Sequence, residues 1–146
     1  MAKTEKKQEK EPKDQKEIQE KYMEMQLMNQ QMEEFQKQIK TVAEQIEEIG
    51  RIKIALSEFK SFKPGSEMLA PISSGIFVKA KVEKTDELLV NVGGNTTVTK
   101  SVDATKALLE RQLTEIRKVY EELEKNQELM QAKAQKLGSE LQNMVG

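Results

Sequence analysis

Carboxylates are the most numerous groups in this chain that could do chemistry, but their spacing does not favour catalysis. The chain has 146 residues, with 25 Asp and Glu against 24 Lys and Arg. The pairs Glu47-Glu48 and Glu121-Glu122 stand in segments with helical patterning. Adjacent helix positions do not face each other, so such pairs do not converge on one substrate. We expect them to be solvated surface groups and predict no enzyme.

Other reactive groups are missing from the sequence. Without Cys or His, the chain has no thiol nucleophile, no His general base, no disulfide and no Cys/His zinc site. We therefore expect no metal and no cofactor. Gly93-Gly94 is not followed by Lys and Ser or Thr, so it does not indicate a phosphate-binding loop. Phe77-Val78-Lys79 is an isolated instance of aromatic–basic interleaving, and the net charge of -1 does not favour a nucleic-acid partner.

The composition predicts long helices. Charged residues make up 34% of the chain and aromatic residues 4%, whereas a typical globular domain has about 25% charged residues. Such a chain must be elongated, partly disordered, or completed by other subunits. No apolar run approaches the roughly 20 residues that span a bilayer, and the charged N-terminus does not resemble a signal peptide. We expect a cytoplasmic protein without membrane contact.

The first half of the chain contains a charged tail and a long helix. Residues 1–13 are almost free of apolar side chains and include Pro12, which predicts a disordered tail. Residues 14–60 show a heptad pattern typical of a coiled coil, with Asp14 as a possible N-cap. One apolar series is Ile18, Met25, Met32, Ile39 and Ile46, and it continues to Lys53. The other is Met28, Phe35, Val42, Ile49 and Leu56, and it is preceded by Lys21.

The middle of the chain, residues 61–101, predicts two β-hairpins. Four short β-like runs cover residues 67–72, 75–83, 87–92 and 96–101. Lys84-Thr85-Asp86 is expected to be a hairpin turn between the second and third runs, and Gly93-Gly94-Asn95 is a turn between the last two. Because four short strands leave open edges, we expect them to pair with other subunits and close a β-barrel.

Heptads return in residues 102–146 and predict a second helix, with Ser101 or Asp103 as its cap. Its two series are Val102, Leu109, Ile116, Leu123, Met130, Leu137 and Met144, and Lys106, Leu113, Tyr120, Gln127, Ala134 and Leu141. Two helices of similar length around a compact insert favour an antiparallel coiled coil within one chain. The alternative is a parallel homodimeric zipper, which would usually carry charged partners beside the seam. The flanking positions of the first helix lack such charges: Asn29, Gln36, Ala43, Gln31, Gln38 and Gln45. The predicted fold is therefore α+β, a long antiparallel coiled coil with two hairpins that form an oligomeric barrel platform.

Apolar residues outside the heptad seam predict a binding surface. The tip of this coiled coil consists of the two free helix ends, and exposed apolar groups there indicate an interaction site. These off-seam residues are Tyr22, Met23, Leu27, Leu129 and Val145. The seam itself is rich in Met, which adapts to varied apolar partners; the alternative is that these residues only pack the coil. Gly138 indicates fraying, while Ile52, Ile54 and Leu108 are expected to pack on the hairpins.

Two stretches in the middle of the chain resemble alpha-type subunits of the prefoldin family. They are GSEMLAPISSGIFVKAKV, with its most specific part from Leu69 to Ala80, and ELLVNVGGNTTV, from Leu89 to Gly94. The resemblance extends over about residues 14–146, and two hairpins rather than one favour the alpha type. Ser73-Ser74 and Asn95-Thr96 depart from the Gly/Ala-rich turns of the family, and the charged leader is long.

The resemblance implies a function and two surfaces. It implies a hexamer of two alpha and four beta-type subunits that holds unfolded client proteins without ATP and delivers them to a group II chaperonin. The client-binding residues would be at the tips: Tyr22, Met23, Met25, Leu27, Met28, Leu129, Met130, Leu137, Leu141, Met144 and Val145. The assembly residues would be in the hairpins: Leu69, Ile72, Ile76, Phe77, Val78, Val82, Leu88, Val90, Val92 and Val98. The alternative function is a coiled-coil adaptor that binds one defined protein.

Overall fold

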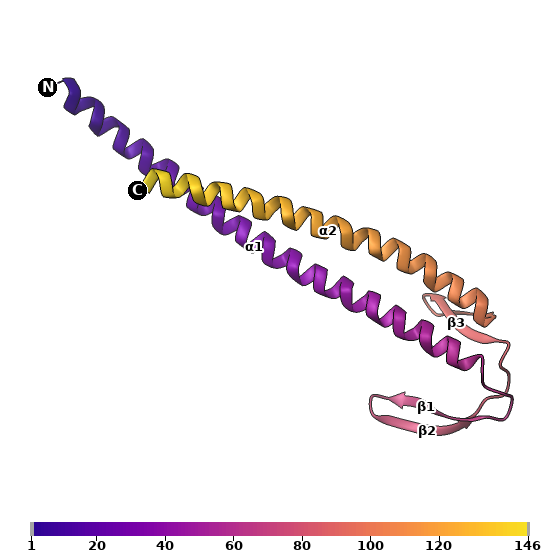
Figure 1. Cartoon of the computed structure of the whole chain (residues 1–146). Coiled ribbons are helices and arrows are strands. Elements are labelled where there is room, and N and C mark those ends of the chain that lie inside the picture. Colours follow the sequence, from indigo (N-terminus) through magenta and orange to yellow (C-terminus); the bar gives the residue numbers. More distant parts are fainter. Residues whose placement is uncertain (1, 146) are drawn as a thin grey trace. The chain divides into compact units, whose positions relative to one another are not determined.

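The structure, a computed structural model, describes the backbone of residues 2–145 and the side chains of residues 14–145. Helix α1 (Ala2–Phe59) is followed by strands β1 (Glu67–Ser73), β2 (Ile76–Lys81), β3 (Leu88–Gly93) and β4 (Thr96–Lys100), and then by helix α2 (Val102–Val145) (Figure 1). This order of elements confirms the predicted α+β fold of two long helices with two hairpins between them. No described helix has a segment long and apolar enough to cross a membrane.

The heptad positions form the packed seam of the helices. In both helices, every predicted seam position is buried or half-buried, even where the residue is Lys21, Lys53 or Gln127. The flanking positions are mostly exposed. The most buried seam side chains are Ile49, Val102, Leu113, Ala134, Leu137 and Leu141. The periodicity therefore identified the packed face correctly, and a thin apolar seam takes the place of a thick core.

Helix α1 begins at Ala2, before the predicted start at Asp14. The backbone of residues 2–13 is helical where the sequence predicted a disordered tail, and Asp14 does not cap the helix. Lys, Glu and Gln dominate this segment, and all three are good helix formers. Their intrinsic preference accounts for the helix despite Pro12.

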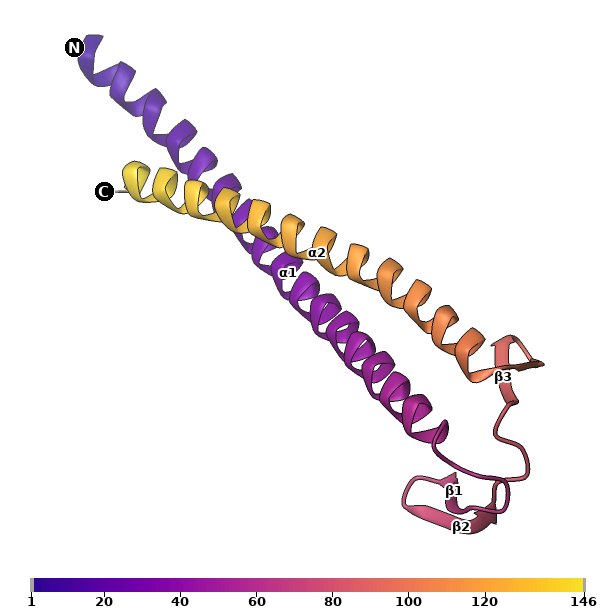
Figure 2. The ribbon, with the colours of Figure 1, turned by 45° about the vertical axis from the view of Figure 1, so that its right-hand side comes forward.

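The contacts within the chain divide it into two compact units. The helical unit comprises Met1–Ala43 and Lys118–Gly146, and the hairpin unit comprises Glu44–Arg117. In the helical unit the last turns of α2 cross α1 in both ribbon views (Figures 1 and 2), and Lys21 Nζ lies 3.1 Å from Glu140 Oε2. The helices are antiparallel, so their free ends meet in this unit.

In the hairpin unit the two helices are also antiparallel. Lys53 forms an ion pair with Glu110, and Lys60 forms one with Asp103. From the first ion pair to the second, the residue on α1 lies one heptad later in the sequence and its partner on α2 lies one heptad earlier. The regular register brings the same faces of the two helices together at each step.

Two separate two-stranded sheets make up the strand region. β1 pairs with β2 and β3 pairs with β4, both antiparallel. Val82 is buried, and its backbone bonds to Gly65 and Ser66 at 2.7 and 2.9 Å. The prediction of a hairpin turn at Lys84-Thr85-Asp86 is wrong, because this segment links the two sheets. The first hairpin instead turns at residues 74–75, where Gly75 has a φ of 79° that favours glycine.

Ser101 caps the start of α2, as one of the two predicted candidates. The backbone N–H of Ala104 donates to Ser101 Oγ at 3.1 Å. The hydroxyl of buried Thr105 donates to the carbonyl of Ser101 at 2.8 Å. The first bond satisfies an N–H that a helix start leaves without an intrahelical partner, and the second pairs the buried hydroxyl of Thr105. The second candidate, Asp103, pairs with Lys60 instead.

The apolar residues Ile52 and Ile54 do not pack on the hairpins, contrary to the prediction. Ile54 is 63% exposed and Ile52 is 40% exposed. Both lie off the seam, and the paired strands of this chain do not cover them. Burial predicted from hydrophobicity alone therefore fails at these two positions.

Candidate functional site

The helical unit carries the exposed apolar residues that the sequence placed off the seam. Met23 is 70% exposed and Tyr22 is 51% exposed, while Leu27, one helical turn beyond Met23 on α1, is 56% exposed. Leu129 and Val145 of α2 are also exposed. These five side chains lie in the region that includes both helix ends. Their exposure on an otherwise polar segment makes them candidates for an interaction surface.

The remaining predicted client-binding residues are less accessible. Met25, Met28, Met130 and Met144 are half-buried in the seam. Leu137 and Leu141 are buried, with only 7% and 4% of their surfaces exposed. The structure therefore places these two leucines between the helices, where they pack in the seam and leave little of their own surface accessible.

A shallow groove lies beside the exposed residues. Its volume is about 400 Å³, within the range of small-ligand sites. The residues that line it are Tyr22, Met25, Gly138, Leu141, Gln142 and Val145. Sequence reasoning missed Gly138 and Gln142 because neither is apolar. The sequence offers one signal, a glycine within a heptad segment. That glycine predicts fraying of the helix end, yet α2 continues to Val145.

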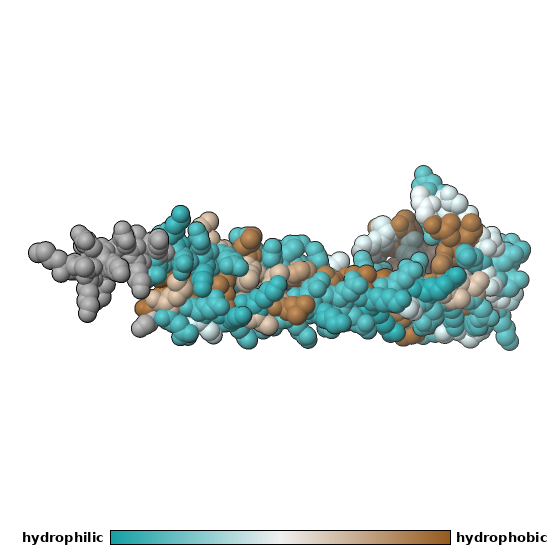
Figure 3. Space-filling model, turned by 90° about the horizontal axis from the view of Figure 1, so that it is seen from above, coloured by the Kyte–Doolittle hydropathy of each residue, from teal (hydrophilic) through white to brown (hydrophobic). Residues whose placement is uncertain are grey.

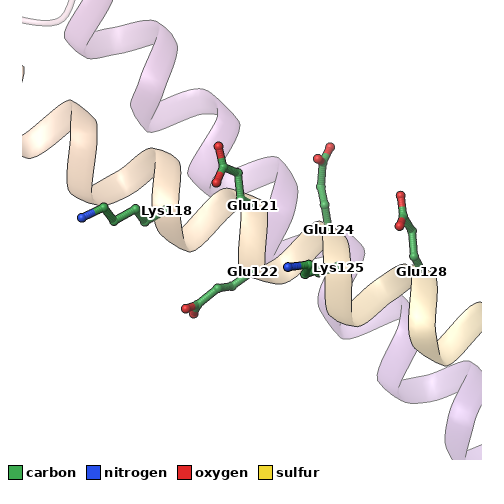
Figure 4. Close-up of a pocket in the computed structure, with 6 residues that line it drawn as sticks. All are labelled: Lys118, Glu121, Glu122, Glu124, Lys125 and Glu128. Carbon is green, nitrogen blue, oxygen red and sulfur yellow. The ribbon is translucent and has the colours of Figure 1, made fainter.

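Two further hollows in the helical unit have a different chemistry. One is lined by Asn29, Met32, Glu33, Gln36, Gln127 and Gln131. The other is lined by Lys118, Glu121, Glu122, Glu124, Lys125 and Glu128. Figure 4 shows that Glu121, Glu124 and Glu128 project to the same side of α2 without converging. A hydrogen bond and the charge of Glu124 raise the pKa of Tyr120. Solvated carboxylates in a row are not an acid–base pair, in agreement with the prediction from their spacing.

The hairpins present apolar side chains on both faces. On the first hairpin, Leu69, Ile72, Ile76, Phe77 and Val78 are all exposed. On the second, Leu88, Val90 and Val98 share one half-buried face, whereas Leu89 is 78% exposed on the other. Figure 3, a view of one face of the chain, shows part of this apolar surface in brown among the teal polar atoms. Of the predicted assembly residues, Val82 alone is buried within the chain itself.

The strands also leave backbone groups open. Each sheet has two strands, so every strand has one edge without a neighbour in its own sheet. Isolated hairpins are marginally stable in water, and open edges with apolar side chains pair readily with other chains. The hairpin unit therefore has both the edges and the apolar faces that assembly requires.

Comparison with known proteins agrees with this arrangement. Residues 28–146 match the family model described as "Prefoldin subunit". The chain is 32% identical to prefoldin subunit alpha of Thermofilum pendens over 61% of this chain and 69% of that protein. It is 28% identical to prefoldin subunit alpha of Methanococcus vannielii over 89% of this chain and 82% of that protein.

A solved structure has the same fold. A chain in the cryo-EM structure of filamentous PFD from Methanocaldococcus jannaschii superposes with a TM-score of 0.70, covering 79% of this chain and 95% of that chain at 23% sequence identity. The match of the family model extends over most of α1, both hairpins and all of α2. On these grounds the chain belongs to the prefoldin family, as a subunit of the alpha type.

Proposed function

We propose that this chain is part of an ATP-independent holdase, which captures non-native proteins at the free helix ends and delivers them to a group II chaperonin in the cytoplasm. Membership of the prefoldin family supports a chaperone-type, non-enzymatic function. The observation that carries the proposal is the exposure of Tyr22, Met23 and Leu27 on α1. Non-native proteins expose apolar segments, and these side chains can bind them without a fixed geometry.

Weak contacts of this kind become useful when several act together. Prefoldin alpha subunits assemble into oligomeric complexes, so one client can contact several helical units at once. Linked weak contacts raise the overall affinity while each contact still exchanges quickly. A holdase that must release its client without nucleotide hydrolysis needs this combination.

The proposed partners in assembly are beta-type subunits, four of them with two alpha subunits. The exposed faces and open edges of the two hairpins support this proposal. Strands added from neighbouring subunits would pair the edges, and closure into a barrel would remove them altogether. The same event would cover Phe77 and Leu89, which are exposed in the single chain.

The test uses the chain assembled with a beta-type partner. A chemically denatured protein is diluted into buffer without nucleotide, and aggregation is followed by light scattering. The test variant replaces Tyr22, Met23 and Leu27 by Ser. The control, Val119→Ser, removes an apolar residue that is 48% exposed on the same unit but outside the proposed surface.

The proposal expects the triple variant to need a higher concentration than wild type for equal suppression, and Val119→Ser to behave as wild type. Both variants must first be shown to assemble to the wild-type mass. Equal suppression by the triple variant would refute binding at this surface. Saturable binding of one folded protein, with no suppression by any form, would favour an adaptor.

A further inference from the structure

We propose that Gly138 positions Met25 so that the groove at the helix ends accepts one large apolar side chain from an extended, uncharged segment of a client. This inference rests on the proposed holdase function and assigns a specificity-determining role to a residue without a side chain. The groove is the hollow of about 400 Å³ between Tyr22, Met25, Gly138 and Val145.

The backbone of α2 does not require a glycine at position 138. The residue is helical and has no left-handed φ. In a helix interior, glycine is less favourable than alanine because it loses more conformational freedom on folding. A glycine at such a position needs another reason, and a close approach by a neighbouring side chain is one.

Met25 supplies that reason. A Cβ atom built at Gly138 would lie 3.1 Å from Met25 Cε, tighter than ordinary van der Waals contact. The missing side chain therefore lets the methyl group of Met25 lie against α2, where it forms part of the groove lining. Because Met is unbranched and has three rotatable side-chain bonds, it can also adjust to different occupants.

The lining of the groove defines the chemistry of its occupant. Tyr22, Met25 and Val145 supply apolar surface above the buried Leu141, and none of the described residues that line the groove is charged. The nearby charges of Lys21 and Glu140 are paired with each other at 3.1 Å. The two other hollows described above are lined by charged and amide side chains, with Met32 as their one apolar residue. Of these three hollows, this groove therefore favours an apolar side chain most.

Two uncharged polar groups at the groove match a peptide backbone. The phenol of Tyr22 and the amide of Gln142 can donate and accept hydrogen bonds. An extended segment has free backbone N–H and C=O groups, whereas a folded helix has already paired them. The combination of apolar walls with neutral polar groups therefore points to an extended segment with one aromatic or long aliphatic side chain.

A second helical glycine provides a matched control. Gly50 lies within α1, and a Cβ built there would meet nothing within 4 Å. Replacement by Ala at either position should stabilise its helix by improving helix propensity. At Gly138 alone, the new methyl group must displace the end of Met25. The two variants therefore have the same intrinsic effect on helix formation but different effects on the groove.

The experiment follows binding at this one groove within the assembled complex. Only this chain carries Met with ¹³C-labelled methyl groups, and the Met25 signal is assigned by its loss in Met25→Leu. The probe is a short uncharged peptide with a single central Phe; the same peptide with Ser in its place is the control. The shift of the Met25 signal with peptide concentration gives the dissociation constant at the groove.

We expect the Phe peptide to shift the Met25 signal and the Ser peptide to leave it unchanged. Gly138→Ala should weaken binding of the Phe peptide about fourfold, equivalent to the loss of one methyl-sized apolar contact, although it raises thermal stability. Gly138→Leu, which places a bulky side chain in the groove beside Met25, should abolish the shift. Gly50→Ala should raise thermal stability and leave the dissociation constant unchanged.

Three outcomes would overturn the inference. The first is equal affinity for the Phe peptide in wild type and Gly138→Leu. The second is no response of Met25 to the Phe peptide, and the third is a Met25 shift that depends on protein concentration alone, which would make a second copy the occupant. If these occur while the triple Ser variant still loses suppression of aggregation, the holdase proposal stands. If that variant also keeps full suppression, both proposals fail.

Discussion

Two leucines of α2 allow a direct test of whether a buried side chain stabilises the free helix end while an exposed one serves binding. Leu141 is 4% exposed and Leu129 is 61% exposed, although the sequence placed both among the client-binding residues. Replacement of each by Ala removes the same atoms from the same helix. We expect Leu141→Ala to destabilise the free helix end and Leu129→Ala to leave it intact.

The magnitude follows from the packing around Leu141. Replacement of a buried Leu by Ala costs about 2–5 kcal/mol, depending on how far the surroundings close over the space. In the helical unit, α2 packs against a single neighbouring helix, so α1 can move in and the cost falls at the lower end, about 2–3 kcal/mol. An exposed Leu contributes little, so Leu129→Ala should change stability by less than about 0.5 kcal/mol.

Hydrogen exchange of the assembled complex, read by mass spectrometry, measures this difference locally. A loss of about 2.5 kcal/mol in local opening free energy accelerates exchange roughly 70-fold. We expect that acceleration in peptides from residues 130–145 of Leu141→Ala, with little change in residues 102–117. Leu129→Ala should exchange as wild type but suppress aggregation less well. Unchanged exchange in Leu141→Ala, or equal acceleration in both variants, would refute the division by burial.

Three further predictions concern assembly and charge. Phe77→Asp should leave the helical circular dichroism unchanged but reduce the assembled mass measured by light-scattering chromatography. The reason is the high free-energy cost of burying an unpaired charge at an apolar interface. An unchanged mass would contradict this prediction. Lys60 holds the pKa of Asp103 below its ordinary value, so their ion pair stabilises the fold at neutral pH and is lost as pH falls through that lowered pKa. Asp103→Asn should therefore be less stable than wild type above about pH 4 and equal to it in strong acid, by thermal melts across pH. Glu124→Gln should lower the pKa of Tyr120, since Glu124 raises it, and a spectrophotometric titration that shows no change would exclude that contact.

The helices and hairpins could be predicted because their signals are local and periodic. Seam positions repeat with the heptad, so even Lys21 and Gln127 were placed on the packed face by number alone. The turn at Gly93-Gly94 was recognised because glycine is the residue that left-handed turns favour. Such patterns depend on neighbours in sequence and need no knowledge of what packs against them.

The details that failed depend on contacts between distant segments. Gly138 has a role only because Met25 of the other helix approaches it, and the sequence does not state that distance. The exposure of Ile54 was missed for the same reason, since hydrophobicity does not reveal which surface will cover a residue. Lys84-Thr85-Asp86 has the composition of a hairpin turn, yet β2 pairs with β1 and β3 pairs with β4, so this segment joins two separate sheets.

The regular antiparallel register restricts how this chain can change over time. A residue deleted from α1 alone would rotate every later seam position away from its partner on α2. A matched heptad removed from both helices, by contrast, would keep all remaining partners such as Lys53 and Glu110 together. Within the hairpin unit, the paired stretches of the two helices can therefore vary in length only in coordinated steps of about 10 Å. Two stretches that are separated in the sequence by both hairpins must lengthen or shorten together there.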